Sequence, residues 1–403
     1  MSNNNYSEFY TEAGAHMADC QEGGCKECGL TSRYTQDFRG DDAHVCHTCH
    51  TFQQPTFKGL QALQRNLDLQ AGERIGVTTS GGKDSLHALT TMVDLLGPGR
   101  VVALTHHKQG LTHPLAEFNL KQAVGSLGVK LIVVEERKML ARFRQNLALL
   151  LKDPDPALVR VVLCAGCRHG ITKDLYAAGV REGIRKYVSA ASYLELAPFK
   201  EELLARKGAG DLDAGFRKLM SEHQEYNYGD NMFYIERDNG LKYKSNSQDG
   251  RGGLKDRIQE YQLFDLDDYL PNDPEAVEKV VRERFGWRRP ERSWHFDCEI
   301  EKVKDVFYYG LLGFTETDFK LAAMVRHGLL TEAEAHRQLA VVRYGLEHSY
   351  PEMERFLRQH GLASSQRDLQ RFYVNSDYLK LDQQAEQPEE PAVYTDKLAW
   401  GMA

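Results

Sequence analysis

Short apolar runs alternate with amphipathic segments in the first half of the chain. Four runs are rich in β-branched residues, which favours strands over helices; they are ERIGVTT (73–79), VVALTHH (101–107), KLIVVEE (130–136) and RKYVSAASY (185–193). Helical patterns separate these runs, and strands that alternate with helices usually pair in parallel. The pattern therefore predicts an α/β fold in which helices cover both faces of a parallel sheet.

A different pattern begins near residue 200. Charged helical segments with aromatic stripes dominate it, and a loop-like stretch at 229–253 interrupts them. Paired cysteines mark a further small module near the start of the chain. We therefore expect three regions, which are an N-terminal tail and cysteine module at 1–56, an α/β domain at 57–200 and a mainly helical C-terminal region at 201–403.

The composition is that of an ordinary soluble globular protein. The 403 residues are 41% hydrophobic and 27% charged, and 51 basic against 58 acidic residues give a net charge of −7. This balance weighs against a generally basic nucleic-acid binder. The chain opens with polar MSNNNYSEFY, and no stretch approaches the roughly 20 apolar residues of a membrane span. We expect a cytoplasmic protein without membrane insertion.

Six of the eight cysteines form three C-x-x-C pairs. Two of these pairs, Cys25 with Cys28 and Cys46 with Cys49, have the spacing of a four-cysteine zinc ribbon. In a ribbon each pair forms a short knuckle, and the four thiolates surround one Zn²⁺. We therefore predict a structural zinc site. One thiolate could be replaced by a histidine near the second knuckle, namely His44, His47 or His50.

The motif SGGKDS (80–85) lies between a predicted strand and a predicted helix. Its two glycines allow a sharp turn that points backbone N–H groups at an anion, and the helix adds its positive N-terminal end. Lys83 supplies a positive charge, Asp84 could hold Mg²⁺, and Ser80 and Ser85 offer hydroxyl groups. The motif predicts a phosphate-binding loop, although the spacing is not that of a Walker A loop.

SGGKDS on a strand-to-helix turn resembles the PP-loop of ATP pyrophosphatases. The resemblance implies that region 57–200 is a Rossmann-like PP-loop domain of the adenine nucleotide alpha hydrolase type. Such a domain cleaves ATP between its α and β phosphates and transfers AMP to a substrate oxygen. Adenine would lie near the ends of the first strands, beside His107 among others. The implied ATP-binding residues are Ser80, Gly81, Gly82, Lys83, Asp84, Ser85, Thr105 and His106.

The third cysteine pair, Cys164 and Cys167, stands apart from the first two and follows the apolar run 158–163. Many PP-loop enzymes that thiolate tRNA carry such a pair together with one distant cysteine, which here would be Cys298. That resemblance implies a [4Fe–4S] cluster or a persulfide at the three cysteines. The alternative is a metal knuckle, or two buried thiols that support the fold.

A longer resemblance, over about residues 25–345, connects the chain with N-acetyl sugar amidotransferases. It rests on collinear motifs, which are the two N-terminal cysteine pairs, SGGKDS, Phe118-Asn119-Leu120, Cys164-Ala-Gly-Cys167-Arg-His-Gly170, Phe285-Gly286-Trp287, Asp297-Cys298 and TDFKLAAMVRHGLLTEAEA (317–335). The resemblance includes the helical C-terminal region, which distinguishes the N-acetyl sugar amidotransferases from the tRNA thiolases.

This resemblance implies an ATP-dependent, AMP-forming enzyme whose product sugar enters lipopolysaccharide biosynthesis or modifies flagellin. Its acceptor would be a nucleotide sugar, whose acetamido group becomes an acetamidino group with ammonia from a glutaminase–cyclase partner. The implied cofactors are ATP, Mg²⁺ and Zn²⁺, with a [4Fe–4S] cluster as a further candidate. The sequence leaves the oligomeric state open, a homodimer included. The residues expected to act in catalysis are Lys83, Asp84, Cys164, Cys167 and Cys298.

Two other functional hypotheses remain. The first is a sulfurtransferase that thiolates tRNA or a small metabolite through Cys164, Cys167 and Cys298. The net negative charge weighs against tRNA, and the predicted ribbon is not itself basic. The second is a zinc-dependent interaction protein without catalysis, which the intact Lys83 and Asp84 disfavour.

Overall fold

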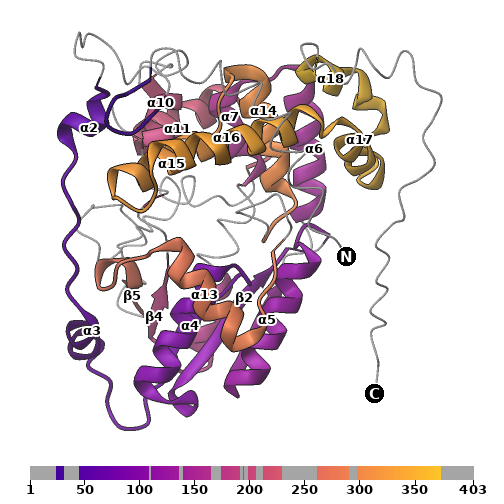
Figure 1. Ribbon diagram of the computed structural model, residues 1–403. Coiled ribbons are helices and arrows are strands. Elements are labelled where there is room, and N and C mark those ends of the chain that lie inside the picture. The colour runs from indigo at the N-terminus through magenta and orange to yellow at the C-terminus, as the bar shows by residue number, and fades with distance from the viewer. Residues whose placement is uncertain are drawn as a thin grey trace, which may run out of the picture.

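The computed structural model describes residues 24–30, 45–108, 110–135, 139–164, 174–190, 194, 198–205, 212–228, 261–289 and 297–373. These residues form two units, a parallel sheet with its covering helices and a helical unit above it in Figure 1.

Five parallel strands form the sheet, in the order β3-β2-β1-β4-β5. Their bounds are Ile75–Thr78 (β1), Val101–His107 (β2), Lys130–Glu135 (β3), Lys186–Ser189 (β4) and Gln262–Asp265 (β5). Successive side chains of β2 are buried on opposite faces: Val101 and Ala103 join one core, whereas Val102 and Leu104 join another. A strand buried on both faces needs a continuous apolar run, which explains the sequence VVALT.

Helices from distant parts of the chain cover the sheet. One face packs against α3 (Leu60–Leu67), α4 (Lys83–Leu96), α5 (Pro114–Leu127) and α13 (Pro274–Phe285). The other face packs against α9 (Tyr176–Arg181), where Tyr176 and Tyr187 meet edge to face. This arrangement confirms the predicted α/β class with a parallel sheet.

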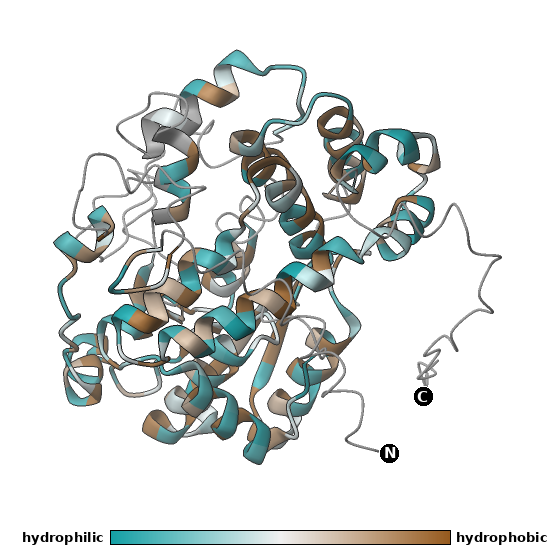
Figure 2. Cartoon of the chain, turned by 45° about the horizontal axis from the view of Figure 1, so that its top comes forward, coloured by the Kyte–Doolittle hydropathy of each residue, from teal (hydrophilic) through white to brown (hydrophobic). Residues whose placement is uncertain are grey.

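The helical unit has its own core. Its elements are α6 (Met139–Lys152), α7 (Pro156–Leu163), α10 (Pro198–Ala205), α11 (Leu212–Glu222), α14 (Ile300–Leu312), α15 (Glu316–Arg326), α16 (Glu332–Glu347), α17 (Tyr350–Gln359), α18 (Gln366–Gln370) and the short α2 (His47–Thr51). Capping boxes at Thr315 and Thr331 fix where α15 and α16 begin. Figure 2 shows hydrophobic residues where these helices meet and hydrophilic residues along their outer faces.

The two units do not follow the region boundary expected at residue 200. Strand β5 and helix α13 come after that position but belong to the sheet unit. Conversely, α6 and α7 precede it, yet Phe143, Leu147 and Leu158 lie in the same core as α14. The mainly helical character of the C-terminal region is confirmed. In the part of the chain that the structure describes, no helix combines the length and apolarity that a membrane crossing requires.

Candidate functional site

The glycine loop, residues 80–85, lies at the carboxyl end of β1, in the middle of the sheet. The chain leaves β1 through α4 toward β2 on one side, whereas β4 pairs with β1 on the other side. The strand order therefore reverses at β1, and open α/β sheets bind ligands in the crevice at such a point. The loop thus occupies the position in this fold where a ligand is most expected.

Hydrogen bonds within the loop hold its turn. The Ser80 N–H donates to Ser85 Oγ at 3.1 Å, and Ser85 Oγ donates to the Gly82 carbonyl oxygen at 2.9 Å. Gly81 has φ +86°, which favours glycine. Helix α4 begins at Lys83 after the N-cap Gly82, which has no side chain to cap the first turn. The positive end of α4 is therefore open to an anion.

Lys83 and Asp84 form a close ion pair within the loop. Lys83 Nζ lies 2.6 Å from Asp84 Oδ1, and only 6% of the lysine side chain is exposed. The same oxygen accepts a 3.1 Å hydrogen bond from Asn272 Nδ2, which comes from the segment between β5 and α13. Two donors therefore fix the Asp84 carboxylate, and one of them, Asn272, was missed by the sequence analysis.

Helix α5 and the segment after α13 support the loop from behind. The Trp287 indole N–H donates to the Gly81 carbonyl oxygen at 3.1 Å. Asn119, in α5, exchanges two hydrogen bonds with the backbone of Arg288, at 2.7 and 3.0 Å. The backbone of Ala116 packs so closely that a Cβ on Gly81 would lie 1.9 Å from its oxygen. The motifs Phe118-Asn119-Leu120 and Phe285-Gly286-Trp287 thus have a structural role beside the loop.

Thr105 and His106 lie at the end of β2, next to the glycine loop. Both are buried, and they directly follow Leu104, whose carbonyl oxygen accepts a 2.7 Å hydrogen bond from the N–H of Thr79. The structure therefore brings these two expected nucleotide-binding residues to the same edge of the sheet as the loop.

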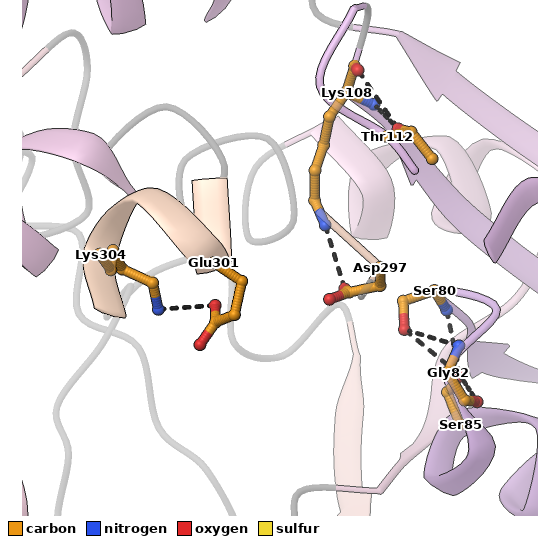
Figure 3. Close-up of polar contacts among 8 residues, drawn as sticks. All are labelled: Ser80, Gly82, Ser85, Lys108, Thr112, Asp297, Glu301 and Lys304. Carbon is orange, nitrogen blue, oxygen red and sulfur yellow. Dashed lines mark hydrogen bonds and ion pairs between the residues drawn. The ribbon is translucent and has the colours of Figure 1, made fainter. Parts of the chain in front are cut away.

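The segment that contains Cys298 is tied to the same edge. Thr112 and Cys298 form an antiparallel bridge, and the N–H of Glu299 donates to the carbonyl oxygen of Leu111 at 2.9 Å. Lys108 Nζ, just past β2, lies 3.1 Å from Asp297 Oδ2. Figure 3 shows this pair together with the loop residues. Cys298 is thereby fixed at the carboxyl edge of the sheet, immediately before α14.

Cys164 is the C-cap of α7 and lies near charged and polar side chains. It interacts electrostatically with Arg160, Lys304 and Tyr308, of which the last two belong to α14. Lys304 is buried, which opposes its charge, but Glu301 at 2.7 Å raises the pKa of Lys304 well above its ordinary value (Figure 3). A partly buried ion pair joins Arg160 and Glu316 at 2.7 Å.

Cys298 directly precedes α14, and Cys164 directly follows α7, whose residues share one core with α14. The third cysteine of the predicted set, Cys167, lies outside the described residues, as do His44 and Cys20. A site shared by all three cysteines stays a prediction.

The two N-terminal cysteine pairs come together as predicted. The sulfur atoms of Cys25, Cys28, Cys46 and Cys49 all lie within 4.8 Å of one another. Two of the separations are 3.7 Å and 3.8 Å. Zn–S bonds of about 2.3 Å in a tetrahedron require S···S distances of about 3.8 Å. The cluster therefore fits a tetrahedral metal such as Zn²⁺, and its thiolate ligands also suit iron.

This cysteine cluster docks on the helical unit. Arg326 Nη1, at the end of α15, lies 3.9 Å from Cys49 Sγ. His336 Nε2, in α16, lies 3.2 Å from the carbonyl oxygen of Gly29, and Phe52 packs edge to face on His327. Burial opposes the charge of Arg326, but Cys28 and Cys49 outweigh it and raise the pKa of the guanidinium. Arg326 therefore offsets part of the negative charge of a metal bound by four thiolates.

Replacing Arg326 by methionine should weaken Zn²⁺ binding about 10- to 100-fold, the range typical of groups that contact metal ligands. Methionine keeps much of the buried side-chain volume and removes the charge. Competition with a fluorescent zinc chelator measures the affinity. The control is Arg337→Met, because Arg337 is exposed on α16. Equal zinc affinities in the two variants would contradict a role for Arg326 at the metal.

The sequence was compared with protein-family models and with curated proteins. No family model matches the chain, and no curated protein matches it.

Proposed function

We propose that the protein is an ATP-dependent, AMP-forming enzyme that activates a carbonyl or amide oxygen and then transfers nitrogen to the activated carbon. The observation that carries this proposal is the glycine loop, which ends at the start of α4 with the buried Lys83 paired to the partly buried Asp84. A loop at the point where the strand order reverses supports a nucleotide as the ligand.

The residues of the loop suit attack at the α-phosphorus. A substrate oxygen bonds to that phosphorus, and the bond to the β-phosphate bridge breaks, so pyrophosphate leaves with its electron pair. The loop N–H groups and Lys83 would neutralise that leaving group. Bound Mg²⁺ would supply further charge neutralisation, and Asp84 is the residue that would hold it. The adenylated substrate then loses AMP when a nitrogen nucleophile attacks its carbon.

The proposed acceptor is the acetamido group of a nucleotide sugar, and the proposed nucleophile is ammonia from a glutaminase–cyclase partner. Both follow from the resemblance to N-acetyl sugar amidotransferases. The helical unit, which lies above the sheet in Figure 1, supports that assignment. Asp297 and Cys298, just before α14, contact Lys108 and Thr112 at the edge where the loop lies. An acceptor would lie between the two units.

Sulfur transfer is the second candidate. It is favoured by the positions of Cys164 after α7 and of Cys298 before α14, because these helices share one core and such chemistry needs a distant cysteine near a C-x-x-C pair. The two candidates share adenylation and differ in the nucleophile. Replacement of Cys164 by serine would abolish sulfur transfer, whereas nitrogen transfer needs no thiol.

The test is to incubate the protein with ATP, ammonium and a panel of N-acetylated nucleotide sugars. We expect AMP and pyrophosphate in equal amounts, with ¹⁵N from ammonium in the product. Lys83→Met should lower AMP formation by at least about tenfold, because the buried charge at the phosphate site is lost. Formation of ADP and phosphate would refute the proposal. Incorporation of ³⁵S from a persulfide donor, with no ¹⁵N, would establish sulfur transfer instead.

A further inference from the structure

Asn272 is a buried side chain with one hydrogen-bonding group satisfied and the other not. Only 5% of the residue is exposed. Its Nδ2 donates to Asp84 Oδ1 at 3.1 Å, whereas its Oδ1 is buried without a hydrogen-bond partner in the described part of the chain. The reverse orientation of the amide would place its oxygen against the Asp84 carboxylate, where two acceptors repel. The unpartnered atom is therefore the oxygen.

A buried carbonyl oxygen without a partner lowers the stability of a fold, and folded proteins contain few of them. In Asn272 the oxygen shares its carbon with the nitrogen that contacts Asp84, so it lies beside that carboxylate. Amide and carboxylate oxygens are the ligands preferred by hard divalent cations. The two side chains thus offer adjacent oxygen ligands at the start of α4, where the glycine loop ends.

The charges around this position show when a cation would bind. Lys83 neutralises Asp84 across 2.6 Å, so the protein alone attracts a divalent cation weakly. Burial lowers the pKa of nearby His87; Asp84 opposes this shift and Lys83 adds to it. His87 is therefore neutral near pH 7 and adds no positive charge. A nucleoside triphosphate brings the negative charge that attracts a divalent cation, and its phosphates also attract Lys83.

We propose that the Asn272 side-chain oxygen and the Asp84 carboxylate together bind the divalent cation that accompanies the nucleotide. This inference rests on the proposed function for the presence of a nucleotide. Asn272 has two parts in it, since its nitrogen orients Asp84 and its oxygen contacts the cation.

The experiment uses Mn²⁺ in place of Mg²⁺ and α,β-methylene-ATP, which resists cleavage between the α and β phosphates. The electron paramagnetic resonance signal of free Mn²⁺ gives its affinity for the full-length protein with the analogue. Asn272→Ala should weaken Mn²⁺ binding by at least about tenfold, which corresponds to 1.4 kcal/mol. Asn272→Asp keeps an oxygen at the same reach and should stay within about threefold of the unchanged protein.

The matched control is Asn146→Ala. Asn146 is equally buried, but its nitrogen donates to the backbone of Val162 and Asn227 in the helical unit. This variant should lose stability without a change in Mn²⁺ affinity. Circular dichroism establishes that each variant folds.

Two outcomes overturn the inference while the proposed function stands. They are an unchanged Mn²⁺ affinity in Asn272→Ala, and an equal loss in Asn272→Ala and Asn272→Asp, which would mean that only the nitrogen matters. Calorimetry of analogue binding to the unchanged protein distinguishes these two outcomes from a third. If the analogue does not bind at all, the proposed ATP site is wrong and the cation site is refuted with it.

Discussion

Substitution of Gly81 by alanine is expected to displace the glycine loop, abolish nucleotide binding and destabilise the fold by about 3 kcal/mol. An unfavourable backbone conformation and a steric clash both destabilise this variant. The φ of +86° is unfavourable for a residue with a Cβ, and that Cβ would lie 1.9 Å from the Ala116 oxygen. The obstacle is the backbone of α5, which cannot rotate away as a side chain could. Urea unfolding and nucleotide calorimetry measure the two effects.

Gly97 provides a matched control in the same structural unit. It follows α4 with φ +81°, and no atom of the described residues lies within 4 Å of where its Cβ would be. Gly97→Ala therefore has the backbone cost of about 1 kcal/mol without the clash, and nucleotide binding should persist. Equal losses of stability in the two variants would contradict the close packing of α5 against Gly81.

The sheet and the glycine loop could be predicted because their signals are local. A β-branched apolar run followed by two glycines and a helical pattern specifies strand, turn and helix within about twenty residues. The same holds for the four clustered cysteines, whose two knuckles are each set by a C-x-x-C spacing. In both cases the residues that form the feature are neighbours in the sequence.

Features that depend on distant contacts could not be predicted. Strand β5 has only four residues, QLFD, and its parallel pairing with β4 is not visible in its own sequence. Helices α6 and α7 are amphipathic, but amphipathicity does not say which core a helix joins. The contacts of Asn272 with Asp84 and of Trp287 with Gly81 span 188 and 206 residues. Without the fold, an asparagine between two elements looks like any loop residue.

Because the cysteine cluster packs on the helical unit, a metal bound there is expected to stabilise more than the cluster itself. The cysteine cluster is not a separate small domain. One hydrophobic core contains Cys25, Cys28 and Cys46 together with residues of α6, α7 and α14. A metal at these cysteines therefore stabilises the helical unit, and the sheet unit with its loop keeps its own core. This arrangement separates the two effects of metal loss in an experiment.

Replacing Cys46 by serine should remove the metal and lower the thermal midpoint of the protein by more than about 5 °C, because ligand loss leaves three thiols in a buried site. Elemental analysis should find about one metal ion per chain before the change and almost none after it, whereas the control Cys20→Ser, outside the C-x-x-C pairs, should keep the metal. Nucleotide binding should survive at temperatures below the midpoint, since the loop is supported by α5 and Trp287. Metal loss with an unchanged midpoint would show that the cluster contributes nothing to the helical core.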